Sequence, residues 1–188
     1  PEGGSSIEWT TNTYHQFDGK NNDVVQLQNG LFLNVHEDHD SDDINYVLGK
    51  YDGERVDWDW TNDVSADENY ANGESPAITV LDNDLVVSVN DKDGKLSYQL
   101  GEYDNDKVYW TKPVEYGDGE KPTIATLENG DLLEVHEGEN HELHYNLGRY
   151  EDGTIDWYSV DNYYGKGDHP NVTLLTNGDI VLVFEGQG

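Results

Sequence analysis

Short stretches of alternating apolar and polar residues, separated by turn residues, run along the chain. In residues 143–147, Leu, Tyr and Leu alternate with His and Asn, a period of two that is typical of a strand with one buried face. Asn129-Gly130 is a strong hairpin signal, and Asp152-Gly153 forms a second turn before the alternation resumes. No stretch has helical periodicity. The pattern therefore predicts an all-β chain.

Three phrases recur along the chain in a fixed order. Leu-x-Asn-Gly, or Leu-x-Asn-Asp, is followed each time by an acid seven residues after its last residue. Tyr-x-Leu-Gly is followed by a Tyr two residues after the Gly, and the third phrase is an aliphatic residue two positions before a Trp. The repeat length is about 49 residues. The copies lie at 27–30, 81–84, 127–130 and 175–178 for the first phrase, at 46–49, 98–101 and 145–148 for the second, and at 7–9, 56–58, 108–110 and 155–157 for the third.

Each repeat holds four predicted strands with evenly spaced turns, which is typical of a β-propeller blade. A β-sandwich gives no reason for a repeat at fixed register, and solenoid repeats are usually shorter. We therefore expect a single β-propeller domain over residues 1–188, with about four blades of four antiparallel strands, one of them incomplete. The repeat units are placed at approximately 19–60, 73–112 and 119–159, and 167–188 together with 7–14 contribute to the incomplete unit.

One strand is missing from this count. The Tyr-x-Leu-Gly phrase occurs three times, whereas its neighbours occur four times. The predicted strand at Ile7–Thr11 and the last predicted strand would then keep open hydrogen-bonding edges, which folded proteins cover or pair. Three interpretations remain: a ring with one three-stranded blade, which we favour slightly, a fragment of a longer array, or a homo-oligomer whose subunits exchange strands.

Composition narrows the choice of partners and location. With 40 Asp and Glu against 10 Lys and Arg, the formal charge of −30 disfavours nucleic acid and anionic membranes as partners. No apolar run is long enough to cross a membrane, and the absence of Cys excludes disulfides and thiol catalysis. The chain starts at Pro1 and has no Met, which favours cleavage of an upstream segment. A secreted, extracellular or halophilic origin is expected, because salt screens the self-repulsion.

Residues at equivalent positions of successive repeats are called a column here, and two aromatic columns have different predicted roles. The repeated Trp shares its strand face with the aliphatic residue two positions before it, so we expect it to pack between neighbouring blades. The Tyr after each Leu-Gly lies near a loop. Three such tyrosines are the predicted ligand-stacking residues: Tyr51, Tyr103 and Tyr150.

Two acidic sets are candidate Ca²⁺ ligands. The first is the column Glu37, Asp91, Glu137 and Glu185 at the ends of the second strands, where a carboxylate can instead accept backbone N–H bonds of the following turn. The second is the run of Asp38, Asp40 and Asp42, which resembles the start of a calcium loop but lacks its later Gly and Glu. A solvated hairpin tip is the alternative for this run.

Enzyme signatures are weak. His136, Glu137 and His141 do not have the spacing of the zinc-protease motif and lie on a predicted hairpin. Paired carboxylates catalyse glycoside hydrolysis, but among 40 acids such pairs arise by chance, so they do not indicate a hydrolase site. A propeller sialidase needs an arginine cluster, whereas this chain has only Arg55 and Arg149. We therefore predict a protein that is not an enzyme, and a hydrolase is the least favoured hypothesis.

The unit from Tyr116 to Trp157 resembles repeats of secreted bacterial and fungal tandem-repeat propellers. Those repeats carry a Tyr-Asp-x-Gly-x-x-Pro phrase, a Val-Glu-Val-His phrase and a final Ile-x-Trp. Departures are Asn22 in place of Pro, Asn90-Asp91 in place of His-Glu, and Phe184 in place of His. Such propellers are often lectin-like, so the resemblance implies glycan binding by analogy of fold.

The sequence thus favours a secreted, non-enzymatic module that binds a glycan or another extracellular ligand. The predicted binding residues are Tyr51, Tyr103 and Tyr150 with nearby acids, and one form of this hypothesis adds bound Ca²⁺. The alternative is a structural protomer of an extracellular polymer or surface layer, assembled when a neighbouring subunit completes the unfinished blade by adding a strand.

Overall fold

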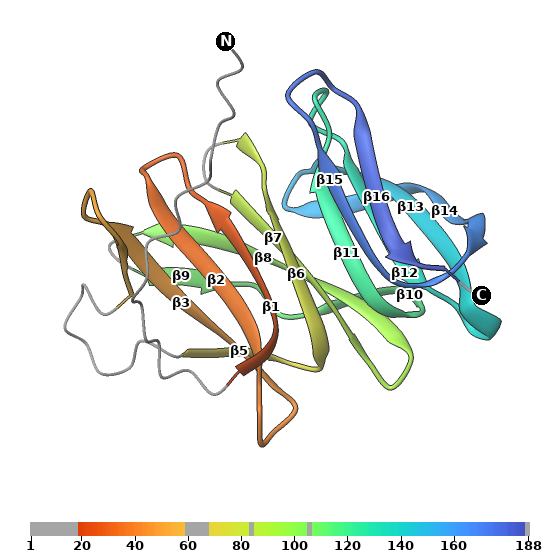
Figure 1. Cartoon of the computed structure of the whole chain (residues 1–188), viewed down its shortest axis with the longest axis horizontal. Helices are drawn as coiled ribbons and strands as arrows, with labels where there is room; N and C mark the ends of the chain where they lie inside the picture. The colour runs from red at the N-terminus through yellow and green to blue at the C-terminus, as the bar shows by residue number, and fades with distance from the viewer. Residues whose placement is uncertain (1–18, 59–67, 83–84, 105–106, 187–188) are drawn as a thin grey trace, which may run out of the picture.

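The computed structural model describes residues 19–58, 68–82, 85–104 and 107–186. Apart from 3₁₀ conformation at Asp82 and at Glu139–His141, the elements in these ranges are strands, paired antiparallel in four sheets that follow one another side by side (Figure 1). The predicted all-β class is confirmed. The strand predicted at Ile7–Thr11 lies outside the described residues. Within them, no helix is long and apolar enough to cross a membrane.

The first three sheets have the same strand order, from an innermost first strand to an outermost fourth position. The first sheet contains β1 (Gly19–Gln26), β2 (Leu31–Asp38), β3 (Asp43–Tyr51), β4 (Val56–Asp57) and β5 (Glu68–Asn72). The second contains β6 (Glu74–Val80), β7 (Leu85–Lys92), β8 (Lys95–Asp104), β9 (Lys107–Trp110) and β10 (Val114–Asp118). The third contains β11 (Glu120–Thr126), β12 (Leu132–Glu137), β13 (Glu142–Glu151) and β14 (Thr154–Lys166), and the fourth contains β15 (Asp168–Leu174) and β16 (Ile180–Glu185).

The outermost strands are longer than the sequence pattern predicted. β5 and β10 continue the fourth position beyond the predicted unit ends near 60 and 112, and β14 runs on to Lys166 rather than stopping near 159. Each extension pairs with the beginning of the third strand, and register shifts interrupt the β13–β14 ladder between its two halves. The alternation is broken at these shifts, so periodicity alone predicts only the first half of the strand.

The prolines lie inside the first strands rather than at their starts. β11 begins at Glu120, two residues before Pro122, and its pairing shifts register between Glu120 and Thr123. Lys121, at φ 51°, is the residue that forms this bulge. Proline fits next to the bulge because the ladder is interrupted there. Its lack of an N–H therefore removes no hydrogen bond between strands.

The innermost strands β1, β6, β11 and β15 line one common space of about 320 Å³. Side chains link each of these strands to the next. Asp23 accepts the Ile78 N–H at 2.9 Å, and the hydroxyls of Thr79 and Thr126 lie 2.9 Å apart. The Val172 N–H donates to the Thr123 hydroxyl at 3.2 Å. These bonds fix the four sheets around the same space.

Tryptophans pack between the first and second sheets and between the second and third, as the sequence predicted for this repeated residue. Trp110 of β9 stacks on Tyr70 of the first sheet with ring centroids 4.1 Å apart, and Trp157 of β14 stacks on Tyr116 of the second sheet at 4.7 Å. A Cβ added to Gly148 would lie 2.6 Å from the Trp157 ring. The Gly of the Tyr-x-Leu-Gly phrase therefore makes room for the tryptophan of its own sheet.

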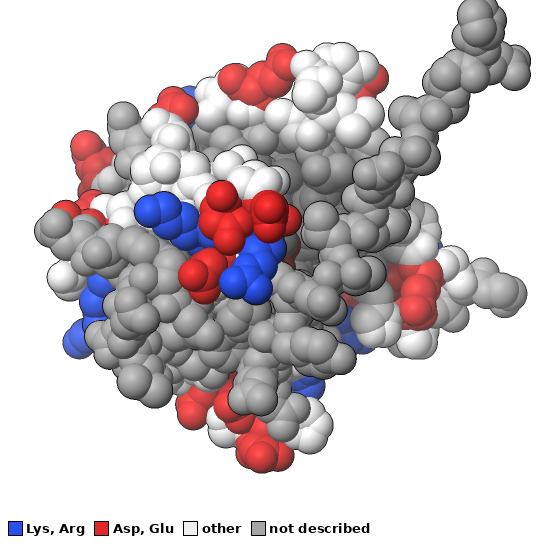
Figure 2. All heavy atoms as spheres, turned by 60° about the vertical axis from the view of Figure 1, so that its left-hand side comes forward, with Lys and Arg blue, Asp and Glu red and all other residues white. Residues whose placement is uncertain are grey.

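Basic side chains at the surface lie among acidic ones (Figure 2). Described ion pairs include Lys107 with Glu68 at 2.7 Å and Arg149 with Asp131 at 2.6 Å. With so few Lys and Arg in the chain, such pairs leave most acids without a cationic partner. The surface is therefore strongly anionic.

Candidate functional site

The predicted site residues lie at two opposite ends of the sheets. In the first sheet, Glu37 faces Ile44 at one end of the β2–β3 ladder, and Leu31 faces Lys50 at the other. Tyr51 directly follows Lys50, so the acid column and the tyrosine column are separated by roughly 20 Å of strand. The structure does not bring the two sets together.

The three tyrosines belong to three different sheets. Tyr51 is 55 % exposed and donates its hydroxyl hydrogen bond to the Gly53 carbonyl, and Tyr150 is 38 % exposed. Tyr103 is partly buried and packs against the core between the first and second sheets. Each tyrosine offers a separate surface, and ligand stacking on them stays a prediction.

Two acids of the column fasten one sheet to the next. Glu37 is buried and accepts the Ser75 N–H at 3.4 Å, besides an ion pair with Lys20 at 2.6 Å. Asp91 accepts the Lys121 N–H at 3.0 Å, and its burial raises the pKa of that carboxyl to about 6. As the alternative to Ca²⁺ binding, the sequence predicted that these carboxylates accept hydrogen bonds from N–H groups of the turn after the second strand. The N–H groups belong instead to the first strand of the next sheet.

The remaining predicted metal ligands have other environments. Glu185 lies at the exposed end of β16, 3.7 Å from His169. The Asp38 carboxylate accepts the backbone N–H groups of Asp40 and Ser41 at 2.8 and 2.9 Å, which shapes its own hairpin. Asp40 and Asp42 are exposed on that hairpin. The run thus has the geometry of the hairpin tip that was the alternative to a calcium loop.

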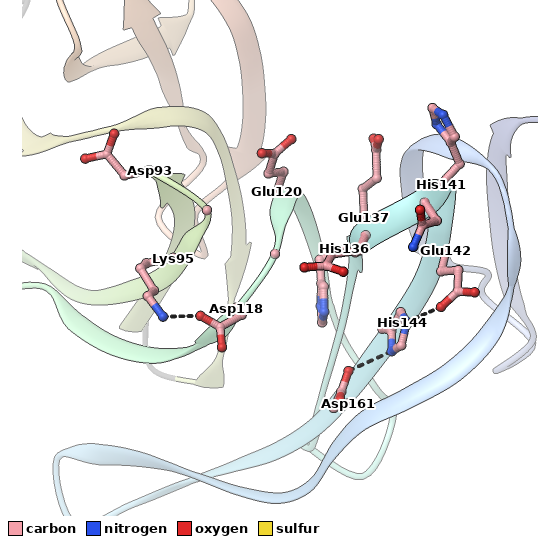
Figure 3. A pocket seen from close by; sticks show the side chains of 15 residues that line it. Asp93, Lys95, Asp118, Glu120, His136, Glu137, His141, Glu142, His144 and Asp161 are labelled. Atoms are coloured by element: carbon pink, nitrogen blue, oxygen red, sulfur yellow. Dashed lines mark hydrogen bonds and ion pairs between the residues drawn. The ribbon is translucent and has the colours of Figure 1, made fainter.

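A polar groove of about 870 Å³ lies between the second and third sheets, at the end that carries the acid column (Figure 3). We call it the acidic groove. Its walls come from the β7–β8 hairpin, from the link between β10 and β11, and from the β12–β13 connection. It is lined by Asp93, Gly94, Lys95, Asp118, Gly119, Glu120, His136, Glu137, Gly138, Glu139, Asn140, His141, Glu142, His144 and Asp161.

Hydrogen-bond acceptors dominate the groove. Seven of its side chains are carboxylates and one is a lysine, Lys95, which is paired with Asp118 (Figure 3). His144 lies 2.7 Å from Asp161 and 3.6 Å from Glu142. The groove therefore offers many acceptors to a ligand and a cationic side chain that is already engaged.

An exposed aromatic ring lies beside the groove. Tyr163 is opposite His144 in the β13–β14 ladder, 57 % exposed, with its ring centroid 5.9 Å from that of His144. His136 is different, because it is buried, bonded to Glu134 at 3.1 Å and packed where a Cβ on Gly119 would lie. Tyr163 thus supplies a stacking surface, whereas His136 is structural.

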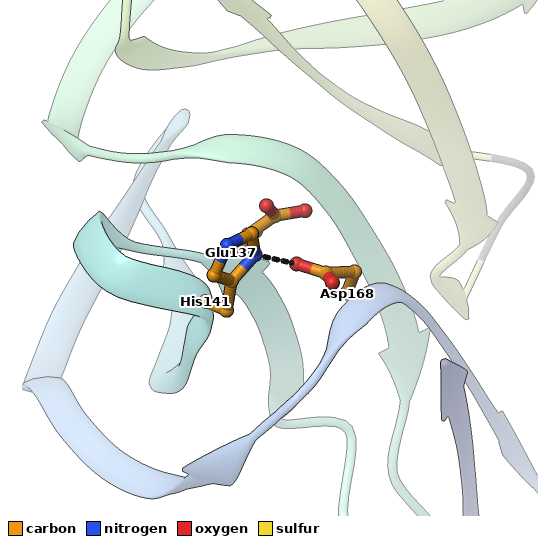
Figure 4. A group of neighbouring side chains, drawn as sticks. All are labelled: Glu137, His141 and Asp168. Carbon is orange, nitrogen blue, oxygen red and sulfur yellow. Dashed lines mark hydrogen bonds and ion pairs between the residues drawn. The ribbon is translucent and has the colours of Figure 1, made fainter. Parts of the chain in front are cut away.

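One group among the described residues has the composition of a metal site. Ligand atoms of Glu137, His141 and Asp168 lie within 4.8 Å of one another (Figure 4). Glu137 also pairs with Lys121 at 2.9 Å, and His141 bonds to Asp168 at 2.6 Å, so all three side chains already have partners. An imidazole ligand suits transition metals better than Ca²⁺. Of the seven predicted Ca²⁺ ligands, only Glu137 belongs to this group.

Sequence reasoning missed groove residues, and the tyrosine beside the groove, because it stopped the outer strands too early. Asp118 of the groove lies at the end of β10, and Asp161 of the groove and the neighbouring Tyr163 lie in the second half of β14. A signal was available in the repeated Tyr-x-x-Gly-x-x-Pro spacing, which occurs at 70–76, 116–122 and 164–170. This spacing marks the end of each outer strand and the bulge of the next first strand.

No protein-family model and no curated protein matches the sequence. Solved structures with similar folds include a mutant of NanB sialidase from Streptococcus pneumoniae, at a TM-score of 0.64 and 14 % identity over 86 % of this chain. NanB with Optactamide gives 0.58 and 14 % over 86 %, and a candidate 6-phosphogluconolactonase from Bacteroides uniformis gives 0.58 and 15 % over 85 %. This chain spans 26 % of the sialidase chain and 46 % of the lactonase chain. At this identity the likeness concerns the fold, which is all-β with propeller-type neighbours.

Proposed function

We propose that this chain is a propeller-type glycan-binding module of about four blades, the fourth incomplete, and that it binds sugars without converting them. The three complete sheets share one strand order, and the second and third sheets each stack a tryptophan on the sheet before them. The sialidase among the structural neighbours supports a carbohydrate-related fold by analogy.

The acidic groove is the observation that carries this proposal. Sugars present many hydroxyl donors around a weakly apolar ring, and they bind where acceptors converge beside an aromatic surface. Carboxylates of the groove provide the acceptors, and Tyr163 provides an exposed ring next to His144. A volume of about 870 Å³ accommodates a short oligosaccharide.

The charge of the groove selects among glycans. Seven carboxylates against one paired lysine repel sugars that carry carboxylate, sulfate or phosphate groups. Neutral sugars and cationic amino sugars are the ligands that fit. The proposal therefore separates this chain from an enzyme that acts on an anionic sugar.

The arginines support a role without catalysis. Arg149 pairs with Asp131 on the third sheet, and Arg55 lies beside Asp52 on the first. The two guanidinium groups are on different sheets, so they do not form the cluster that a sialidase-type reaction requires. An extracellular location, with high salt or divalent cations around the protein, is part of the same proposal.

A glycan array is the first test, run with and without Ca²⁺. We expect binding of neutral or amino-sugar glycans and no binding of sialylated ones. Glu139→Gln and Tyr163→Ala are then expected to weaken the best ligand at least tenfold by calorimetry. The matched controls are Glu151→Gln and Tyr150→Ala, which make the same changes at the opposite end of the third sheet.

Several outcomes would contradict the proposal. Loss of binding in Tyr150→Ala with retention in Tyr163→Ala would move the site to the predicted tyrosine column. Release of free sugar from a bound glycan, followed by chromatography, would show an enzyme. No binding on the array in either buffer would remove the glycan hypothesis altogether.

Self-assembly is the second candidate function, favoured by the edge of β16. This strand pairs with β15 alone among the described residues, and Ile180 and Val183 on it are 49 % and 63 % exposed. Such an edge can accept a strand from another subunit. Light scattering on the purified chain tests this role, because a stable monomer at high concentration excludes obligate strand exchange.

A further inference from the structure

The two complete contacts between sheets have the same construction. At each one, a Trp from the outer strand stacks on a Tyr of the preceding sheet and meets the edge of a second Tyr: Trp110 with Tyr70 and Tyr46, and Trp157 with Tyr116 and Tyr98. The residue two positions before the Trp donates its N–H to the hydroxyl of the second Tyr. These bonds join Val108 to Tyr46 at 3.3 Å and Ile155 to Tyr98 at 3.1 Å.

The contact between the third and fourth sheets has the same two tyrosines and a hollow in place of the tryptophan. Tyr145 and Tyr164 correspond to Tyr98 and Tyr116 in the repeat and line an apolar hollow of about 660 Å³. Leucines and valines of β12, β13, β15 and β16 form the other walls. Within the described part of the chain, the Tyr145 hydroxyl has no hydrogen bond and no Trp packs here. We call this space the tryptophan hollow.

We propose that the tryptophan hollow is the binding site of the segment Ile7-Glu8-Trp9 of the same chain. This segment repeats the aliphatic-x-Trp phrase of Val108–Trp110 and Ile155–Trp157. Its indole covers Tyr164 and meets the edge of Tyr145, and its Ile7 N–H donates to the Tyr145 hydroxyl, as the equivalent groups do at the two complete contacts.

Chain length supports the same chain as the source of the segment. At the complete contacts, Gly119 follows Trp110 by nine residues and Gly167 follows Trp157 by ten, and each Gly precedes a first strand. Gly19, at the start of β1, follows Trp9 by ten residues. Ten residues reach up to roughly 33 Å. The middle of β1 and part of β15 line the same central space.

Fluorine NMR of the chain labelled with 5-fluorotryptophan tests this assignment. The resonance missing from Trp9→Phe belongs to Trp9. We expect this resonance to show little shift between H₂O and D₂O, because the indole is buried, and to keep that protection on dilution to low micromolar concentration. Tyr164→Ala is expected to move it and expose it to solvent.

Tyr163→Ala is the matched control, because it removes the neighbouring tyrosine, which faces His144. It should leave the Trp9 resonance unchanged, and the resonances assigned by Trp110→Phe and Trp157→Phe report in every variant whether the sheets are folded. The proposal would be overturned if the Trp9 resonance showed the full H₂O/D₂O shift of an exposed indole. It would also be overturned if the resonance were protected but did not change in Tyr164→Ala. Protection lost on dilution would show that a second copy supplies the segment and would equally overturn it. None of these three results bears on glycan binding.

Discussion

Equivalent residues of the repeat have different surroundings, and the acid column shows this best. Glu37 has an ion pair and a backbone donor, Asp91 has one backbone donor from Lys121, and Glu185 lies at an exposed strand end. The same sequence position therefore gives different electrostatics in each sheet. Only Asp91 combines burial with a pKa raised to about 6, to which the nearby Glu74 and Glu120 also contribute.

Asp91 should make stability depend on pH in a defined direction. Its pKa is about 6 in the folded chain and 3.8 in the unfolded chain, so the folded state binds the proton more tightly. Its contribution to stability is complete below about pH 4 and is lost as the pH rises through 6. A difference of this size corresponds to roughly 3 kcal/mol at most.

We expect Asp91→Asn to flatten this dependence, because the amide cannot ionise and its oxygen still accepts the Lys121 N–H. Urea unfolding at several values between pH 4 and 7 measures it, with the exposed Asp93→Asn on the same hairpin as the control. Parallel curves for Asp91→Asn and the wild type would contradict the assigned pKa.

At the scale of strands, tight packing between a glycine and a tryptophan explains the Tyr-x-Leu-Gly phrase. Gly148 on β13 lies under the ring of Trp157 on β14 and has no positive φ, so only space requires glycine there. Gly101 and Trp110 have the same relation, with a closest approach of 2.8 Å for an added Cβ. The phrase is therefore a consequence of strand pairing within one sheet.

Gly148→Ala is expected to lower the free energy of unfolding by about 1 to 3 kcal/mol, since an added methyl group must displace the indole or the strand. The control is Gly165→Ala on β14, where an added Cβ meets nothing within 4 Å. Urea unfolding compares the two variants. Equal stability of both would show that the Trp157 ring moves aside without cost.

At the scale of the whole molecule, the charge of −30 dominates the dependence on salt. The Debye length falls from about 10 Å at 0.1 M to about 3 Å at 1 M, so salt weakens repulsion between surface carboxylates that lie farther apart. We expect the melting temperature to rise by several degrees from 0.05 to 1 M NaCl, measured by circular dichroism. A fall in this range would show that ion pairs such as Lys107–Glu68 matter more than the net repulsion.

Much of the fold could be predicted from the sequence because its causes are local. Asn129-Gly130 forms the expected hairpin, with Gly130 at φ 81° and the Asn129 side chain accepting the Asp131 N–H. The inward parity of Trp110 and Trp157 follows from the alternation along a strand. By contrast, the register shifts that lengthen β14 to Lys166 have no periodic signature, so its second half was missed.

The candidate site was less predictable than the fold. Glu137 was among the predicted ligands, but Asp161 was not, because it reaches the acidic groove through the missed half of β14. Tyr163, which contacts the groove residue His144, lies in the same half. The tyrosine column, chosen for its position near loops, lies at the other end of the sheets. Which loops share an end depends on the direction in which every strand runs.

The sequence by itself determined the repeat, the alternation of each strand and the turn chemistry, since these depend on neighbours within a few residues. The tertiary structure decided what meets across sheets: the Lys121 N–H at Asp91, the acids of the groove, and the hollow beside Tyr145. Such contacts join residues far apart in the chain, and a shift of register by one residue moves a side chain to the other face of its sheet. No local pattern specifies them.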